Sequence, residues 1–325
     1  MTAYSSTAEK TEYRASASRL IIVLRSFALL ISVFVLSLLY PDKIAHSVKS
    51  GLDLCYRVIV PSVFPFLVIS DLLYRVYDFT SIKCIGRIFE KIFKINGSGF
   101  LPFALGCSCG FPLGVKCCVE TYEAKDITRD EAERLIGFCN NTGPAFVICG
   151  VGLGLRKDII QGIVLYIAML ISAVLVGILF SIGKKPSAAL NTKRDIGPFS
   201  LTDSIKSAGL GTVNICAYIT FFACAVGLLR ALLKESLPYL FLISFVEIGS
   251  ATSILSKTAL LSAPSSLAMT SFAISFSGLS VHLQALSYIK GTDIGVSRYF
   301  AMKLLQGAVA GGITIPLYLL ANSIL

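Results

Sequence analysis

The sequence GCSCGFPLGVK at residues 106–116 interrupts an apolar block that would otherwise form one membrane-spanning helix. It holds three glycines and a proline within a few turns of chain. Glycine loosens a helix, and proline removes a backbone N–H and clashes with the preceding turn. In lipid, the backbone groups freed by such a break must be buried in protein or face a wet cavity. The stretch therefore predicts the tip of a re-entrant helical hairpin.

The composition agrees with a membrane protein. Hydrophobic residues make up 55% of the 325 residues and charged residues only 15%, whereas soluble domains carry about 25% charge. The 21 Phe and 13 Tyr exclude a disordered chain. An ordinary soluble enzyme is excluded too, and an all-α polytopic membrane protein is predicted. The apolar blocks lie at residues 20–40, 52–74, 98–118, 133–154, 159–182, 207–232, 237–256, 265–289 and 298–323.

The distribution of Lys and Arg bears on the topology. The net charge of +10 is dispersed through short loops, so nucleic-acid binding is not expected. If blocks 98–125 and 237–263 are hairpins that return to their side of entry, 21 basic residues lie inside and 8 outside. If both blocks cross fully, the split is 16 to 13. The positive-inside rule therefore favours two re-entrant hairpins and a cytoplasmic N-terminus.

The two halves of the chain resemble each other. SVKS at residues 47–50 recurs as SIKS at residues 204–207, although chance similarity between apolar segments is the alternative. Three crossings in the first half make the second half inverted, which is the architecture of secondary transporters with broken helices. The expected parts are a cytoplasmic tail (1–19), a first transmembrane helix (20–40), a first repeat (47–182), a cytoplasmic linker (183–203) and a second repeat (204–325).

Four interruptions of the apolar blocks form the candidate site. The first is 106–116, and the second is FCNNTGPA at residues 138–145, in a helix that starts with a predicted Thr128–Glu131 capping box. The others are EIGSATS at residues 247–253 and SFSGLSVHLQ at residues 275–284. Half-helix ends and polar side chains at membrane depth mark substrate paths. The candidate substrate-binding residues are Ser108, Gly110, Lys116, Asn140, Asn141, Thr142, Glu247, Ser250, Thr252, Ser277, His282 and Gln284.

Each of these candidates also has a purely structural interpretation. Lys116 can snorkel to the headgroups, and the Asn140 and Asn141 amides can join helices. Glu247 can pair with a basic residue such as Lys116, and His282 can hydrogen-bond a neighbouring helix.

Other polar residues are expected to have no functional role. Asp71 and Arg75 are predicted to form an ordinary i, i+4 pair. The ten cysteines are interpreted as soft packing residues, because they lack the paired spacing of a zinc site. No nucleotide-binding loop, metalloprotease motif or nucleophile elbow is present in the sequence, so no catalytic residue, metal or cofactor is expected.

Three motifs carry a resemblance to a known family: PSVFPF at residues 61–66, SCGFPLGVK at residues 108–116, and EAERL followed by FCNN within residues 131–141. The chain resembles the YlbJ-type sporulation integral membrane proteins, which are members of the Gate (nucleoside-recognition) domain class. The resemblance extends over residues 47–323. The chain departs from the family pattern where it has Ser-Cys-Gly-Phe-Pro in place of Ser-Gly-Phe/Tyr-Pro, and in its many cysteines.

The resemblance implies a fold similar to concentrative nucleoside transporters, with two hairpins and two unwound helices around a central site. It also implies a role in spore formation, where the family is associated with moving dipicolinate from the mother cell towards the forespore. The leading hypothesis is a secondary transporter of a small organic anion in the lipid bilayer. The alternatives are a metal-ion permease using Cys107, Cys109 and Cys139, a nucleoside permease, and a non-transporting membrane protein needed for spore envelope assembly. Homo-oligomer formation is left open.

Overall fold

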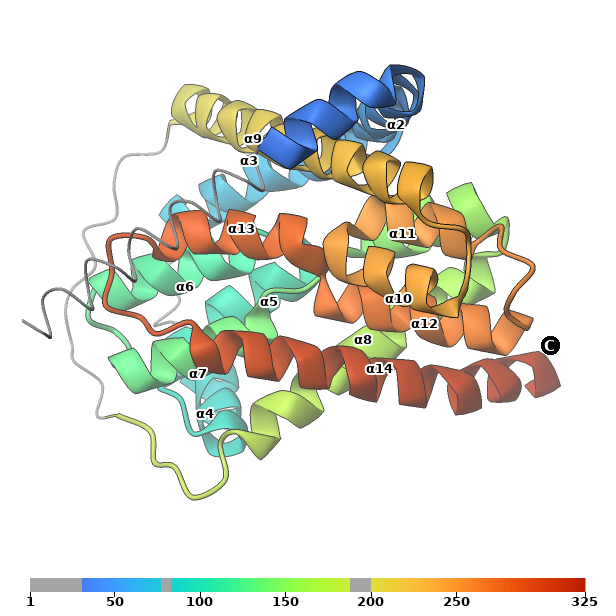
Figure 1. Ribbon diagram of the computed structural model, residues 1–325. Coiled ribbons are helices and arrows are strands. Elements are labelled where there is room, and N and C mark those ends of the chain that lie inside the picture. Colours follow the sequence, from blue (N-terminus) through green and yellow to red (C-terminus); the bar gives the residue numbers. More distant parts are fainter. Residues whose placement is uncertain (1–30, 77–82, 188–199, 325) are drawn as a thin grey trace, which may run out of the picture.

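The computed structural model describes residues 31–76, 83–187 and 200–324, which form helices joined by short connections (Figure 1). Four helices are long and apolar enough to cross a membrane, and a fifth crossing follows if Ile31–Leu39 and Pro41–Ile59, which meet at 100°, form one span. The chain is therefore an all-α polytopic membrane protein, as predicted. The predicted tail 1–19, residues 20–30 of the first helix and residues 188–199 of the linker lie outside the described residues.

The α-helices are α2 (Pro41–Leu54), α3 (Val60–Val76), α4 (Lys83–Phe93), α5 (Phe100–Ser108), α6 (Leu113–Glu123), α7 (Arg129–Cys139), α8 (Ile159–Leu179), α9 (Leu201–Leu232), α10 (Leu237–Val246), α11 (Ile248–Leu255), α12 (Ala263–Phe276), α13 (Gly278–Ile289) and α14 (Ser297–Ile324).

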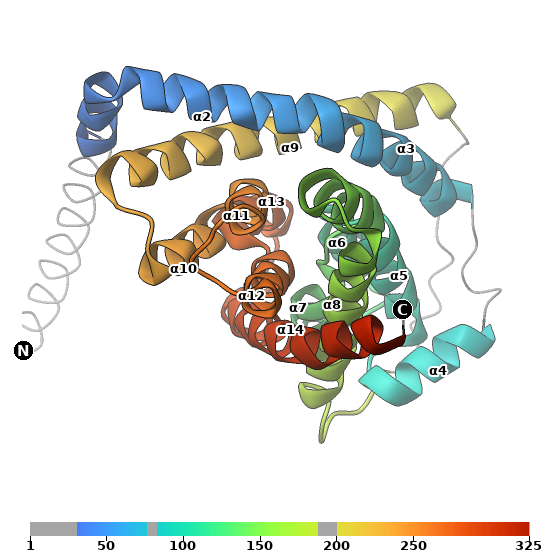
Figure 2. The same cartoon turned by 90° about the vertical axis from the view of Figure 1, so that its right-hand side faces the viewer.

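Two long helical segments pair across the top of Figure 2. One consists of α2, a π-helical turn (Cys55–Ile59) and α3, and the other is α9. They run antiparallel, because Gly51 lies against Ala223 while Asp71 accepts a hydrogen bond from Ser204. The first segment starts at Pro41 rather than at residue 52, since proline fits the first turn of a helix. One segment comes from each half of the chain, so this pair ties the halves together.

Each half contains a pair of short helices at a predicted hairpin. In the first half, α5 and α6 pack against each other on either side of Gly110, whose φ of 88° suits only glycine without strain. In the second half, α10 and α11 meet at Glu247, which has an extended backbone. The short helices therefore end inside the molecule. They end at glycine and proline in the first hairpin and at a single non-helical residue in the second.

Each half also contains a helix that is broken inside the molecule. The helix α7 ends at Cys139, and a π-helix (Ala145–Arg156) follows the break. The helices α12 and α13 are separated at Ser277, where φ is 81°. Both breaks lie where the sequence places polar residues in apolar blocks.

The hairpin tips rest on the helix breaks. A Cβ added to Gly106 or Gly114 would overlap the carbonyl oxygen of Cys139, and one added to Gly278 would lie 3.4 Å from the backbone of Glu247. Two apolar cores flank this region, one around Phe138 and the other around Phe146. Backbone-to-backbone contact at glycine thus holds the hairpin tips against the helix breaks, between these two apolar cores.

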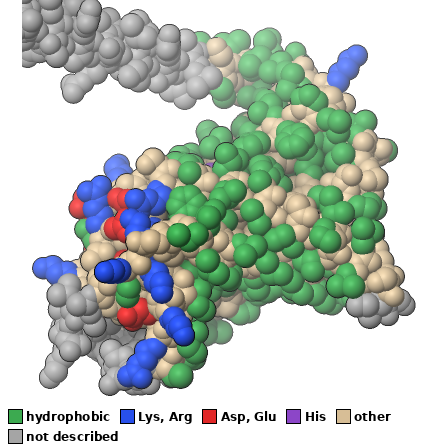
Figure 3. Space-filling model, turned by 90° about the horizontal axis from the view of Figure 1, so that it is seen from below, with side chains coloured by type: hydrophobic (Ala, Val, Ile, Leu, Met, Phe, Trp, Pro, Cys, Tyr) green, Lys and Arg blue, Asp and Glu red, His purple; other side chains and the backbone are tan. Residues whose placement is uncertain are grey.

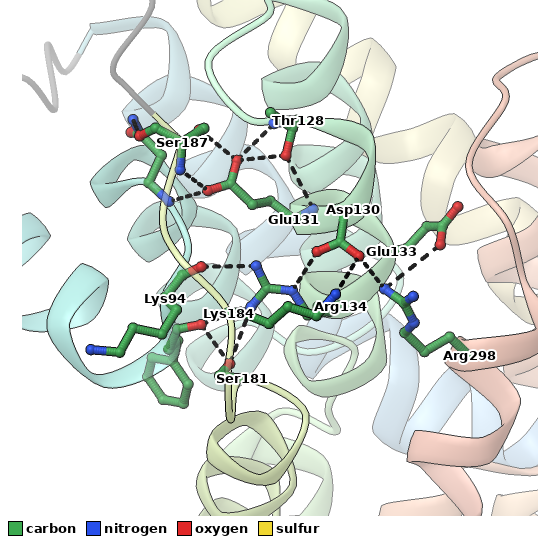
Figure 4. A network of polar contacts seen from close by, with 12 residues as sticks. Lys94, Thr128, Asp130, Glu131, Glu133, Arg134, Ser181, Lys184, Ser187 and Arg298 are labelled. Carbon is green, nitrogen blue, oxygen red and sulfur yellow. Dashed lines mark hydrogen bonds and ion pairs between the residues drawn. The ribbon is translucent and has the colours of Figure 1, made fainter.

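Charged side chains gather at one end of the molecule, next to a broad apolar surface (Figure 3). Thr128 and Glu131 form the predicted capping box there. The Glu131 carboxylate also accepts hydrogen bonds from the backbone N–H groups of Asn96 and Ser187, both within 2.9 Å (Figure 4). The buried Arg134 guanidinium donates to the carbonyl oxygens of α4 and its following turn. This network joins three segments that the positive-inside rule predicts on one side.

Asp130 is the second hub of this end. It accepts hydrogen bonds from Arg134, Lys184 and Arg298 at 2.8 to 3.2 Å (Figure 4). Burial alone would raise the pKa of the Asp130 carboxyl, but these three cations outweigh it and lower the pKa to about 2. Asp130 therefore links α7, the end of α8 and α14 through charge.

Candidate binding site at the helix breaks

A small cavity lies where the two hairpin tips meet the two helix breaks. Its volume is about 30 Å³, which is room for one or two water molecules. Apolar residues of α2, α3 and α9 also line it. Five of the predicted site residues line it, one or more from every interruption: Ser108, Gly110, Thr142, Glu247 and Gln284. The structure thus brings together segments that are up to 176 residues apart in the sequence.

Gln284 is the most unusual residue of this cavity. Its side chain is 2% exposed, and neither amide atom has a hydrogen-bond partner among the described residues. The nearby Ser275 and Ser280 hydroxyls on either side of the second break are also buried and unpaired within that part of the chain. A buried polar group without a partner costs about 1–3 kcal/mol. The unpaired Gln284 amide therefore favours a polar occupant of the cavity.

Glu247 has a different role from the ion pair weighed for it. Its two carboxylate oxygens accept the backbone N–H groups of Gly249 and Ser250, so it caps the start of α11. The Lys116 ammonium lies instead beside Asp71 and Glu120. The Glu247–Lys116 pair that was weighed as an alternative is therefore not formed. Glu247 caps the start of α11, and Lys116 pairs with the Asp71 carboxylate.

The Asn140 and Asn141 side chains hydrogen-bond neighbouring helices and do not line the cavity. The Asn140 amide donates to the Tyr299 hydroxyl at 2.9 Å. The Asn141 carbonyl accepts the Gln306 amide at 2.8 Å, and its amide nitrogen donates to Phe138. Both amides thus hold the first break against α14, which is the helix–helix role that the sequence leaves open.

His282 joins the same network from α13. One ring nitrogen, Nδ1, lies 2.8 Å from the Tyr299 hydroxyl, while Nε2 has no partner among the described residues. Its ring packs edge-on against Phe276 and Tyr299. Tyr299 therefore connects the broken helices of the two halves through Asn140 and His282.

Sequence reasoning missed Lys303, the charged residue closest to this network. Lys303 is fully buried, and its Nζ donates to the Asn140 carbonyl and to the Gln306 side chain, both at 2.8 Å. In the sequence it counts as an interfacial lysine, because it lies near the start of α14. The signal that could have found it is the polar face formed by Tyr299, Lys303 and Gln306 at spacings of four and three on an apolar helix.

Lys116 lies in a second cavity of about 200 Å³ between α3, α6, α9 and α13. Its Nζ is 3.4 Å from the Asp71 carboxylate, which also accepts the Ser204 hydroxyl at 2.7 Å. Asp71 thus links three helices, whereas the side chain of Arg75, its predicted i, i+4 partner, lies outside the described residues. Lys116 is therefore separate from the first cavity and is neutralised by Asp71.

The remaining candidates stabilise local backbone. Thr252 donates to the Gly249 carbonyl, Ser277 donates weakly to the Ile274 carbonyl, and Ser250 takes part through its backbone N–H in the Glu247 cap. None of the three lines the first cavity. Across residues 31–76, 83–187 and 200–324, no group of three or more His, Cys, Asp or Glu side chains is placed to hold a metal ion.

The fold and the site together define a class: an integral membrane protein of helices whose hairpin tips and helix breaks surround a small, largely apolar cavity with a few polar groups in its lining. The chain is 27% identical over 335 residues to the sporulation integral membrane protein YlbJ of Bacillus subtilis (strain 168), and the alignment covers 89% of this chain and 80% of YlbJ. This similarity supports the predicted placement of the chain in the YlbJ-type family. No family model and no solved structure matches the chain, so the Gate class and the likeness to nucleoside transporters stay predictions.

Proposed function

We propose that the chain is a secondary transporter of a small organic anion, and that this anion is dipicolinate, moved during spore formation. The observation that carries the proposal is the cavity at the meeting point of hairpin tips and helix breaks, with the buried and unpaired Gln284 amide in its lining. Broken helices at a central site are the arrangement by which many secondary transporters bind substrate. The similarity to YlbJ supports the link to sporulation, and dipicolinate follows from the resemblance given by the motifs.

The cavity is too small for this anion in the present conformation. A planar aromatic dicarboxylate is larger than one or two water molecules, so binding requires a hairpin tip to move away from its break. The first tip suits such movement, because Gly110 meets Gly143 backbone against backbone. The antiparallel pair of α2–α3 and α9 then serves as the fixed part of the molecule.

An anion at this site needs positive charge nearby. The N-terminus of α11 is already capped by Glu247 and offers little. Lys303 supplies a full charge behind the cavity, because its acceptor Asn140 lies two residues before Thr142, which lines the cavity. Lys303 therefore replaces Lys116 as the proposed source of positive charge.

Uptake by proteoliposomes that contain the purified chain tests the proposal. Labelled dipicolinate, uridine and ferrous iron are offered separately, and we expect saturable uptake of dipicolinate alone. Gln284→Leu should weaken its binding roughly ten- to a hundred-fold, since a hydrogen bond to a charged ligand contributes about 1.5–3 kcal/mol. The matched control is Gln161→Leu at the start of α8, which lies outside the cavity lining.

The other outcomes contradict the proposal in distinct ways. Preferential uptake of ferrous iron or uridine would assign the chain to a metal-ion or nucleoside permease. A folded protein that moves none of the three compounds, with Gln284→Leu indistinguishable from the wild type in sporulating cells, would favour a non-transporting role in spore envelope assembly.

A further inference from the structure

Lys303 is a lysine in an apolar interior without an acidic partner. Its side chain is fully buried, and no carboxylate lies within ion-pair distance of it among the described residues. The Asn140 carbonyl and the Gln306 side-chain oxygen are its two hydrogen-bond acceptors. A charged side chain at membrane depth is costly and usually functional. Packing alone therefore does not explain a lysine at position 303.

The two hydrogen bonds suit both protonation states of Lys303. A neutral amine has two N–H groups, and both are used here. An ammonium has three, so one N–H would be left for another acceptor. The same geometry thus accommodates the group with and without its extra proton, which an ion pair with a carboxylate would not do.

The charged form acts on the helix break. Asn140 follows the last residue of α7, where the helix dipole presents partial negative charge. An ammonium–carbonyl hydrogen bond is about twice as strong as a neutral one. A protonated Lys303 therefore holds the Asn140 carbonyl more firmly, and with it the neighbouring Thr142, which lines the cavity.

The titratable groups around Lys303 are two thiols, one imidazole and one phenol. The Cys139 and Cys107 thiols face it from α7 and α5, and His282 faces it from α13. The helices α8 and α12, which also pack against α14, contain no acidic or basic residue. On α14 itself, Tyr299 reaches the same Asn140 residue through its hydroxyl.

We propose that Lys303 is a proton-binding site that couples transport to protons: its protonated form holds the unwound segment 140–143 in the shape that lines the cavity, and deprotonation releases that segment. The inference rests on the proposed function for the identity of the transported anion. The effect of Lys303 on the unwound segment does not depend on the proposed function. Uptake of a proton by Lys303 balances one negative charge of the anion, and the proton returns to water when the segment moves.

A measurement without substrate tests the site directly. Hydrogen exchange of the amides in 139–147 is followed against pH in detergent and corrected for the intrinsic pH dependence of exchange. We expect protection to fall with rising pH in the wild type, to stay high in Lys303→Arg, and to be low at every pH in Lys303→Met. Lys257→Met, on the exposed connection after α11, is the matched control and should follow the wild type. Equal pH dependence in the wild type and Lys303→Met overturns the inference.

A second measurement links the site to the ligand. Calorimetric titration with dipicolinate in buffers of different ionisation enthalpy gives the number of protons taken up on binding. We expect uptake of about one proton in the wild type and none in Lys303→Met. Binding with the same uptake in both proteins overturns the coupling role and leaves the proposed function intact. Absence of binding in the wild type contradicts dipicolinate as substrate, while the hydrogen exchange result still decides the role of Lys303.

Discussion

Gly106 and Gly114 determine how closely the first hairpin approaches the broken helix α7. Each lacks the Cβ that would overlap the Cys139 carbonyl oxygen. The contact is backbone against backbone, so a neighbouring side chain cannot adjust to make room. At this scale, the shape of the polar centre depends on the absence of single methyl groups.

Replacing Gly114 with alanine should therefore destabilise the protein. Overpacking of a tight contact costs about 1–3 kcal/mol, and thermal unfolding of the purified variant in detergent measures the loss. Gly312→Ala on α14 is the matched control, because an added Cβ meets nothing within 4 Å there, and it should stay within about 0.5 kcal/mol of the wild type. Equal stability of both variants would show that the hairpin shifts freely away from α7.

The sequence predicts some residues of the site and not others, for physical reasons. Thr142, Glu247 and Gln284 are recognisable because they are polar within apolar blocks, and all three line the cavity. Lys303 is not recognised, because a lysine near a helix end ordinarily reaches the headgroups. The Asp71 partner of Lys116 lies 45 residues away, and local sequence patterns carry no information on such pairings.

The helix α7 illustrates how an element is held at both ends. At its start, Asp130 gathers three cations, and at its broken end Asn141 is bonded to Gln306 of α14. The capping box and the Gly-Pro break were both predicted, because capping residues and helix breakers act within one or two turns. The start of α2 at Pro41 was not predicted, since residues 41–51 are polar in sequence and only their packing on α9 places them in a long helix.

Acid should weaken the charged end of α7 in a defined range. The pKa of Asp130 lies at about 2 in the folded protein, below its ordinary 3.8. A carboxyl with a lowered pKa stabilises the fold above its ordinary pKa and loses that effect as the pH falls towards the folded value. The melting temperature of the wild type should thus decline between these two values, and that of Asp130→Asn should decline less. Asp203→Asn, on the exposed start of α9, should follow the wild type; parallel curves for all three proteins would contradict the assignment.

The broken end of α7 is open to a double-mutant cycle. Asn141→Leu and Gln306→Leu each leave buried polar groups unpaired, which should cost about 1–3 kcal/mol. Because the two side chains bond each other, the double variant should be more stable than the sum of the single effects implies, by about 0.5–3 kcal/mol. Denaturation in mixed detergent gives the free energies, and strict additivity would mean that the bond contributes nothing.

The whole molecule has a charged end and an opposite end at which Arg156 bonds Ser266 and Thr270. Segments that are distant in sequence meet at the charged end, where Lys184 contacts Asp130 and Glu131 binds Ser187. This agrees with the predicted return of the first hairpin to its side of entry. The inverted repeat itself is predicted only from the few matching residues. General similarity between the halves adds nothing to it, because apolar segments resemble one another by composition alone.

Single cysteines placed on a cysteine-free background test the orientation. We expect positions 125 and 184 to react with a membrane-impermeant maleimide from the cytoplasmic side, and position 156 from the opposite side. The physical reason is the positive-inside distribution of Lys and Arg. Labelling of positions 125 and 156 from the same side would require a different path for the first hairpin.

The bond between Asn141 and Gln306 spans 165 residues, and this has a consequence for how the protein is made. At a synthesis rate of about 5–20 residues per second, the amide waits roughly ten to thirty seconds for its partner to leave the ribosome. During that time the first break is in the membrane with its polar groups unmatched. The newly made first half is therefore expected to stay in contact with the insertion machinery. Its release into lipid before the last helix has been inserted would expose the unpaired polar groups of the first break to hydrocarbon.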